Sequence, residues 1–233
     1  MDKVLVAALV ISSIYFLVLA IPGFIVYGQA PSPRFVEVVT STALHSTLST
    51  LLVVPTSLIL GYAFTFRKVG KFFTPLVLAT IAVPHTAIGV LLSPIIFNLN
   101  LTDTSAAILI GMFIVSCPVG VGVMRASFAA QGVELEQYLR SMGVKGFRLQ
   151  WFYVKESPIS ILLAALLSWF RAFSELGVLL IVAQRPQTVG IYVFEEFLKT
   201  GPAAVISASL ILLGMALILT FVSVVVEGGL RDS

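Results

Sequence analysis

The sequence has 233 residues, of which 58% are hydrophobic and only 11% are charged, and its formal net charge is +3. A soluble globular domain carries about 25% charged residues, so this composition excludes a water-soluble protein and favours a chain folded largely inside a lipid bilayer. About six membrane-spanning helices with their loops use up the whole chain, so we expect a single all-α transmembrane domain over residues 1–233.

Six apolar runs are each long enough to cross a hydrocarbon core of about 30 Å as a helix. The expected spans are Val4–Tyr27, Leu44–Phe66, Thr74–Phe97, Ser105–Met124, Ile159–Ala183 and Ala203–Val226. The first run exceeds the roughly 7 to 15 apolar residues of a signal peptide, which favours an uncleaved span. Pro84 lies inside the third run and is expected to kink it.

The basic residues between these runs predict the orientation of the chain. The second and fourth connections contain Arg67, Lys68, Lys71, Arg125, Arg140, Lys145, Arg148 and Lys155. The other three connections together contain only Arg34, Arg185 and Lys199. The positive-inside bias therefore predicts that both basic loops and both termini lie in the cytoplasm. The sequence thus indicates a polytopic helical bundle, multi-pass in the cell membrane, with N and C termini cytoplasmic.

The long basic connection, about residues 125–157, contains a helical pattern. One face of its first predicted helix carries Leu135, Tyr138, Leu139 and Met142. Glu136 and Arg140 belong to the opposite, polar face, and Gly143 follows at the position of a C-terminal cap. A second short helix is expected at Phe147–Val154. Periodicity leaves two interpretations open, a docking element for a partner protein and an amphipathic helix on the membrane surface.

The stretch from Glu136 to Gly143 resembles the EAA loop of ABC importer permeases, Glu-x-Ala-Ala-Arg-x-Leu-Gly. The glutamate, arginine and glycine match this pattern, whereas a tyrosine and a leucine replace its alanines and the following proline lies two residues farther away than usual. The resemblance implies a type I importer fold and a loop that couples transport to a separate ATPase. The implied coupling residues are Glu136, Arg140, Gly143, Val144 and Phe147.

Two further stretches narrow the resemblance to the oxyanion group. Pro84–Gly89 is similar to the Pro-His-Thr-x-x-Gly stretch of archaeal-type molybdate and tungstate permeases. The stretch from Arg171 to Gly177 is similar to their Arg-x-x-x-Glu-Phe-Gly segment, which also occurs in sulfate permeases. With the loop, these stretches occur in the expected order along the chain. The chain therefore resembles a permease subunit of an oxyanion importer.

Four polar residues at membrane depth are candidates for the translocation path or gate, namely His85, Thr86, Arg171 and Glu175. Arg171 and Glu175 are four residues apart, share one helix face and can form an ion pair. Ionisable residues inside a membrane are costly and mark either function or helix packing, so an anion path and a structural ion pair both remain open. For His85 the alternatives are a hydrogen-bond donor to a passing oxyanion and a contact with a backbone carbonyl of a neighbouring helix.

The sequence contains no phosphate-binding loop, zinc-protease pair or nucleophile elbow, so we expect no enzyme activity, no metal site and no cofactor in this chain. The resemblance implies a homodimer with two ATP-binding subunits that use ATP and Mg, and an external oxyanion-binding protein; no nucleic-acid partner is expected. The alternatives are a permease for sulfate or another anion and an ATPase-independent secondary transporter or channel. The latter often shows an internal repeat, which residues 1–116 and 117–233 lack.

Overall fold

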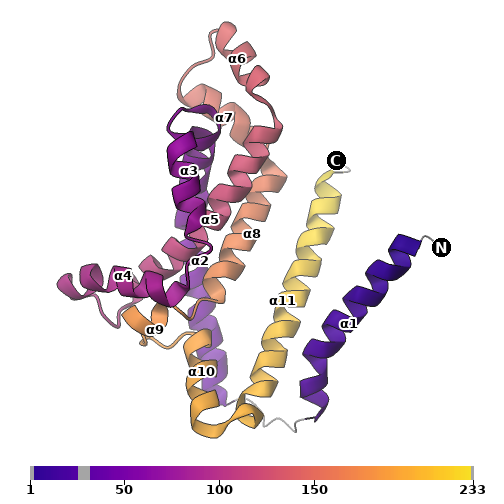
Figure 1. Ribbon diagram of the computed structural model, residues 1–233, viewed down its shortest axis with the longest axis vertical. Coiled ribbons are helices and arrows are strands. Elements are labelled where there is room, and N and C mark those ends of the chain that lie inside the picture. Colours follow the sequence, from indigo (N-terminus) through magenta and orange to yellow (C-terminus); the bar gives the residue numbers. More distant parts are fainter. Residues whose placement is uncertain (1–2, 26–31, 232–233) are drawn as a thin grey trace. The chain divides into compact units, whose positions relative to one another are not determined.

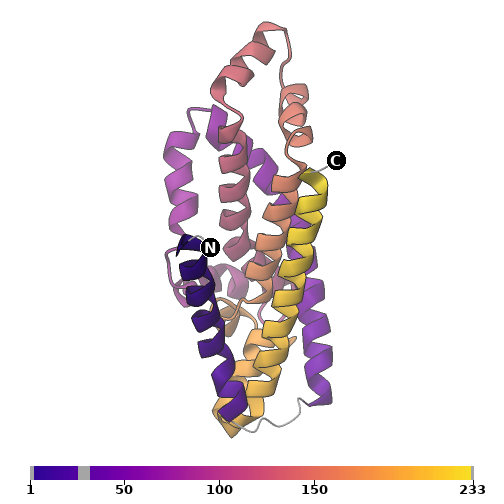
Figure 2. The ribbon, with the colours of Figure 1, turned by 90° about the vertical axis from the view of Figure 1, so that its right-hand side faces the viewer.

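The structure is a computed structural model that describes residues 3–25 and 32–231, and the regular elements within these residues are all helices (Figures 1 and 2). Their bounds are α1 Lys3–Ile25, α2 Pro33–Phe66, α3 Gly70–Ala79, α4 His85–Asn98, α5 Ser105–Ala130, α6 Val133–Ser141, α7 Phe147–Lys155, α8 Pro158–Phe173, α9 Leu179–Val182, α10 Val189–Thr200 and α11 Pro202–Arg231. The chain divides into two compact units. One contains the terminal segments up to Glu37 and from Tyr192 onward, and the other is Val38–Ile191.

Among the described residues, three helices are long and apolar enough to cross a membrane, namely α2, α5 and the Pro202–Val222 part of α11. The pair α7 and α8 passes the same test together, although the two helices are bent by 83° at their junction. The predicted all-α membrane class is therefore confirmed. The predicted end of the first span at Tyr27 and the two chain ends lie outside the described residues.

The fourth predicted span begins where the sequence placed it, at Ser105, because Thr104 caps the helix: its hydroxyl accepts a hydrogen bond from the backbone N–H of Ala107 at 3.2 Å. The helix then continues beyond the predicted end at Met124, to Ala130. The second span also ends as predicted, at Phe66, but α2 starts at Pro33, well before the predicted Leu44.

The third and fifth predicted spans are not continuous helices. The third is divided into α3 and α4 at Pro84, whose missing N–H and steric effect on the preceding residue oppose a helix at that point. The fifth ends as α8 at Phe173 and resumes as the short α9. In its break the carboxylate of Glu175 accepts a hydrogen bond from the backbone N–H of Val178 at 2.7 Å, which replaces a helical carbonyl.

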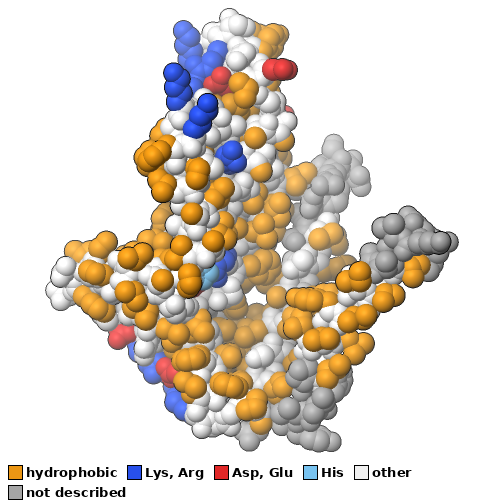
Figure 3. Space-filling view, viewed as in Figure 1, with side chains coloured by type: hydrophobic (Ala, Val, Ile, Leu, Met, Phe, Trp, Pro, Cys, Tyr) orange, Lys and Arg blue, Asp and Glu red, His pale blue; other side chains and the backbone are white. Residues whose placement is uncertain are grey.

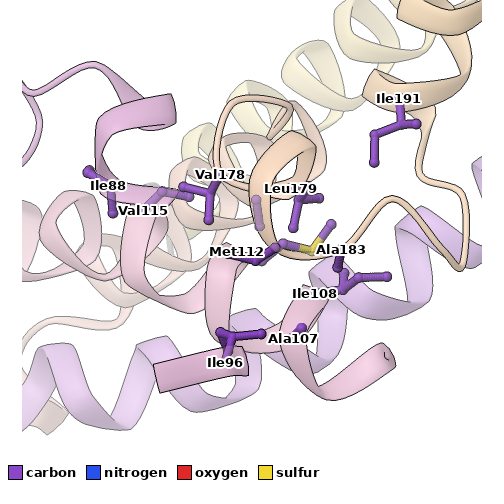
Figure 4. Packing of buried hydrophobic residues seen from close by; sticks show 12 residues of the cluster. Ile88, Ile96, Ala107, Ile108, Met112, Val115, Val178, Leu179, Ala183 and Ile191 are labelled. Atoms are coloured by element: carbon purple, nitrogen blue, oxygen red, sulfur yellow. The ribbon is translucent and has the colours of Figure 1, made fainter. Parts of the chain in front are cut away.

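Helix α5 is the centre of the Val38–Ile191 unit and lies side by side with α8 (Figures 1 and 2). Gly120 allows this approach, because a Cβ there would be only 2.9 Å from the Ser168 hydroxyl of α8. One apolar cluster joins α5 to α4 and α9, with buried residues that include Ile88, Met112 and Leu179 (Figure 4). In a bilayer the alternative to this burial is contact with lipid, so close van der Waals packing stabilises the cluster and not removal of apolar surface from water.

A second cluster lies where α5 meets α2, α6, α7 and α8. Its buried residues are Tyr62, Met124, Phe128, Leu139, Leu149, Tyr153 and Ala164. The cluster anchors the two loop helices, whose existence and approximate bounds confirm the prediction. The predicted apolar face of α6 is only partly right, because Leu139 is buried whereas Tyr138 and Met142 are exposed. Glu136, predicted on the polar outer face, is buried, since it contacts the end of α2.

Candidate functional site

The two broken spans meet at their breaks. A Cβ on Gly177, in the turn between α8 and α9, would lie 2.8 Å from the Cβ of His85 and 3.0 Å from the backbone nitrogen of Thr86. Likewise, a Cβ on Gly89 of α4 would lie 3.0 Å from the carbonyl oxygen of Val178. Real side chains essentially never show the 2.8 Å distance at Gly177, and the 3.0 Å distance at Gly89 is tighter than most, so the two glycines allow the turn to press against the first turns of α4.

This contact brings together three of the four residues predicted for the translocation path. Arg171 donates a hydrogen bond from Nη2 to Oε2 of Glu175 at 2.7 Å, and His85 Nδ1 lies 3.4 Å from the same oxygen. The Nε2 atom of His85 is 2.8 Å from Arg171 Nη2. We refer to His85, Arg171 and Glu175 as the junction cluster. Because its helices are far apart in sequence, spacing alone predicted only the Arg171–Glu175 pair.

The burial of the junction cluster is graded. The Glu175 side chain is 0% exposed, whereas Arg171 and His85 retain 22% and 30% of their side-chain exposure. A buried carboxylate without a partner is strongly destabilising, and here one oxygen contacts Arg171 while the other accepts the N–H of Val178. With a neutral histidine the cluster carries no net charge, and its exposed edge offers N–H groups.

The remaining predicted path residue, Thr86, is exposed on the first turn of α4, beside this edge. The polar contacts of His85 are with side chains of α8 and its following turn, and among the described residues it makes no hydrogen bond to a backbone carbonyl of a neighbouring helix. In the described part of the chain, no group of three His, Cys, Asp or Glu side chains could hold a metal ion.

The predicted coupling residues lie on the hairpin formed by α6, the turn at 142–146 and α7. The N–H of Gly143 donates to the carbonyl of Arg140 and that of Val144 to the carbonyl of Leu139, both at 3.0 Å. These two bonds form a Schellman motif, which requires a left-handed residue after the helix; Gly143 has φ +85°. No heavy atom lies within 4 Å of a Cβ built on Gly143, so the backbone angle alone favours glycine there.

Glu136 ties this hairpin to the end of α2. Its Oε1 atom accepts hydrogen bonds from Arg140 Nε at 2.6 Å, from Tyr62 Oη at 3.4 Å and from Arg67 Nη1 at 3.5 Å. The hydrogen bond to Glu136 raises the pKa of Arg140 above its ordinary value. The i, i+4 spacing predicted the Arg140 contact. Tyr62 and Arg67 were missed, since they come from another helix.

The surface of the hairpin that faces away from the rest of the protein carries exposed aromatic rings. Phe147, a predicted coupling residue, is 75% exposed, and it stacks on Trp151, which is 48% exposed, with ring centroids 6.2 Å apart. Lys and Arg side chains gather over the same end of the unit, where α6 and α7 lie (Figure 3). Exposed aromatic residues beside positive charge are typical both of protein contact surfaces and of helices that lie on a membrane surface, so both interpretations of the hairpin remain. Trp151 was not predicted as part of this surface. Its spacing of four residues from Phe147 could have indicated that the two rings share one helix face.

Comparisons with known proteins agree with these features, although no family model matches the chain. The molybdate/tungstate transport system permease protein of Pyrococcus abyssi is 30% identical over 190 residues, covering 79% of this chain and 75% of the relative. The corresponding protein of Pyrococcus furiosus is 31% identical over 188 residues, with the same coverage. A probable molybdenum ABC transporter permease protein of Haloferax volcanii is 25% identical over 83% of this chain and 79% of its own length. The chain therefore belongs to the molybdate/tungstate transport system permease proteins, the membrane-embedded translocating subunits of ABC transporters.

Proposed function

We propose that this chain forms the membrane pathway of an ATP-driven importer whose substrate is a tetrahedral oxyanion, tungstate or molybdate. Support comes from the names of its relatives and, above all, from the hairpin of α6 and α7. Glu136 holds this hairpin against the rest of the protein, and Phe147 is exposed on the opposite surface of the hairpin. A separate ATPase subunit, using ATP and Mg, docks on this hairpin. Glu136 and Arg140 position the hairpin, Gly143 and Val144 form its turn, and Phe147 contacts the ATPase.

The proposed topology has six crossings with both termini in the cytoplasm. In it, α3 with α4 and α8 with α9 act as broken third and fifth crossings. Exposed Lys71 and Lys145 lie on the cytoplasmic side and exposed Thr102 on the outer side. Cysteines at the two lysines should be shielded from an impermeant thiol reagent added to intact cells, while one at Thr102 should react. Labelling of the Lys145 position from outside contradicts this topology.

The proposed pathway lies between two copies of the chain, because one bundle offers half of a pore. The exposed edge of the junction cluster and the hydroxyl of Thr86 line it and act at a gate. Hydrogen-bond donors without net charge suit this role, since a transported dianion must leave as well as enter. An external binding protein supplies the anion and selects it.

The decisive experiment is reconstitution. The permease, its ATPase and its binding protein in proteoliposomes should accumulate tungstate or molybdate only when ATP is present on the ATPase side, and sulfate far more slowly. ATP-dependent uptake of sulfate in preference to both metal oxyanions would replace the proposed substrate. Uptake without any ATPase would instead establish a secondary transporter.

A further inference from the structure

A basic pocket of about 340 Å³ lies at the end of α2; it shares Arg67 with the hairpin site, and its other lining residues belong to neither site described above. Its lining consists of Phe64, Thr65, Phe66, Arg67, Lys68, Gly70, Lys71 and Arg125. Four of these residues are cationic and none is acidic. They come from α2, from the turn that follows it, from α3 and from α5, so the positive charge is assembled by the fold and not by one stretch of sequence.

Two contacts create the pocket. A Cβ on Gly70 would lie 2.6 Å from the Cα of Phe64, so a glycine is needed for α3 to turn back directly beside the end of α2. The hydroxyl of Thr65 donates to the carbonyl of Gly61 at 2.8 Å and lies 3.3 Å from the carbonyl of Arg125, so α5 passes close to α2 at the same place. The cationic side chains are thereby kept close to one another.

The charges in the pocket are poorly compensated by the protein. Arg67 contacts Glu136 at 3.5 Å, a long ion pair. Lys68, Lys71 and Arg125 are exposed and make no ion pair with any carboxylate of the described residues. Like charges held together repel, and an anion bound among them removes this cost. The positive-inside bias accounts for basic residues on this side of the membrane but not for their gathering around one open pocket, which is the additional observation.

The surroundings indicate which anion fits. On α3, directly after the pocket, the apolar side chains of Phe72, Phe73 and Leu76 are exposed. Since this helix belongs to a proposed crossing, these side chains are available to contact lipid. A ligand that satisfies both features carries an anionic phosphate and a hydrocarbon chain. We propose that the pocket binds the phosphate group of an anionic lipid in the cytoplasmic leaflet, with its chains along the exposed face of α3. The leaflet assignment rests on the proposed topology; the binding itself does not depend on transport.

The test is native mass spectrometry of the purified full chain during titration with phosphatidylglycerol and, separately, phosphatidylcholine. We expect the intact protein to retain phosphatidylglycerol preferentially, and Lys68→Gln/Lys71→Gln to weaken this binding by roughly tenfold or more, since each cation near a lipid headgroup contributes about a factor of five. The matched control is Lys145→Gln/Arg148→Gln, which removes two exposed charges from the hairpin, outside the pocket, and should leave binding unchanged.

Competition separates a lipid from a free anion. Excess inorganic phosphate or tungstate should not displace phosphatidylglycerol, because neither supplies the apolar contact. Equal lipid binding by wild type and the Lys68/Lys71 variant overturns the proposal. A second result also overturns the proposal. In it, tungstate binding is lost in the Lys68/Lys71 variant, whereas phosphatidylglycerol does not bind in a way that depends on these lysines. Neither outcome contradicts the proposed importer function, because the reconstitution experiment tests that function separately.

Discussion

The two candidate sites use the same local device in different surroundings. In the hairpin, Glu136 pairs with Arg140 one helical turn away at 2.6 Å. At the junction, Arg171 pairs with Glu175 at the same spacing and at 2.7 Å. In both, a third polar group arrives from a distant helix to contact the same carboxylate. From sequence alone both are i, i+4 ion pairs, with the acidic residue first in the hairpin and the basic residue first at the junction.

What differs is access to water. Glu136 is nearly as buried as Glu175, with 8% of its side chain accessible, but its cations are exposed, with 38% of the Arg140 side chain and 43% of the Arg67 side chain accessible, so solvent screens the hairpin pair in part. The junction carboxylate is fully buried and its partners are mostly so. A glutamate and an arginine four residues apart therefore brace a hairpin with exposed cations in one place and join two broken helices through a fully buried carboxylate in the other.

The largest effect is expected from unpairing the junction. Glu175→Ala or Arg171→Ala alone leaves an uncompensated buried charge and should destabilise the protein by about 3–5 kcal/mol. The double variant removes both charges and should be less destabilised than either single variant. Thermal unfolding of the detergent-solubilised permease measures all three. Two mild single variants would show that these residues are solvated and independent, and the contrast with the hairpin would disappear.

A steric substitution tests the same junction without changing its charge. Gly177→Ala places a methyl group 2.8 Å from the His85 Cβ and should cost about 1–3 kcal/mol, as overpacking does. The control is Gly122→Ala on α5, where the new Cβ would sit at an ordinary 3.5 Å from Leu78 Cδ2. Unfolding temperatures should fall for the first variant only. Equal behaviour of the two would mean that the turn is not pressed against α4.

The glycine of the hairpin should respond to backbone conformation instead of to space. Gly143→Val forces a β-branched residue to φ +85° at a cost of about 1–2 kcal/mol, whereas Gly143→Asn tolerates that angle better. We expect the valine variant to insert in the membrane but to recover less ATPase and to lose ATP-driven uptake, with asparagine intermediate. Co-purification and ATPase stimulation are the measurements. Normal docking and transport by Gly143→Val would favour the membrane-surface interpretation of the loop.

The smallest effect on stability is expected at the hairpin pair. Glu136→Gln keeps the shape of the side chain and removes a buried carboxylate whose two cationic partners are exposed, so the loss of stability should be smaller than at the fully buried Glu175. Thermal unfolding of this variant in parallel with Glu175→Gln gives a matched comparison of the two carboxylates. A larger loss at Glu136 than at Glu175 would reverse the ranking of the two sites.

Much of the fold could be predicted because local chemistry decides it. Thr104 caps α5 through its own hydroxyl, and Gly143 closes α6 through its own backbone angle, so both boundaries are written in a few adjacent residues. The breaks of the third and fifth spans were harder. Pro84 predicted a kink in the third span. Because the whole run is apolar, the sequence did not predict that the run separates into two helices. In the fifth span no proline marks the break; the Glu175 side chain makes it by accepting the N–H of Val178.

The sequence by itself determined that this protein lies in a lipid bilayer, that it is helical, that it resembles oxyanion permeases and that it has ion pairs at i, i+4 spacing. Each of these depends on composition or on residues a few positions apart. Only the tertiary structure decided that His85 meets the Arg171–Glu175 pair, that Glu136 is buried against Tyr62 and that four cations line one open pocket. These contacts join helices distant in sequence. They depend on how closely glycines such as Gly177 let backbones approach, which no periodicity encodes.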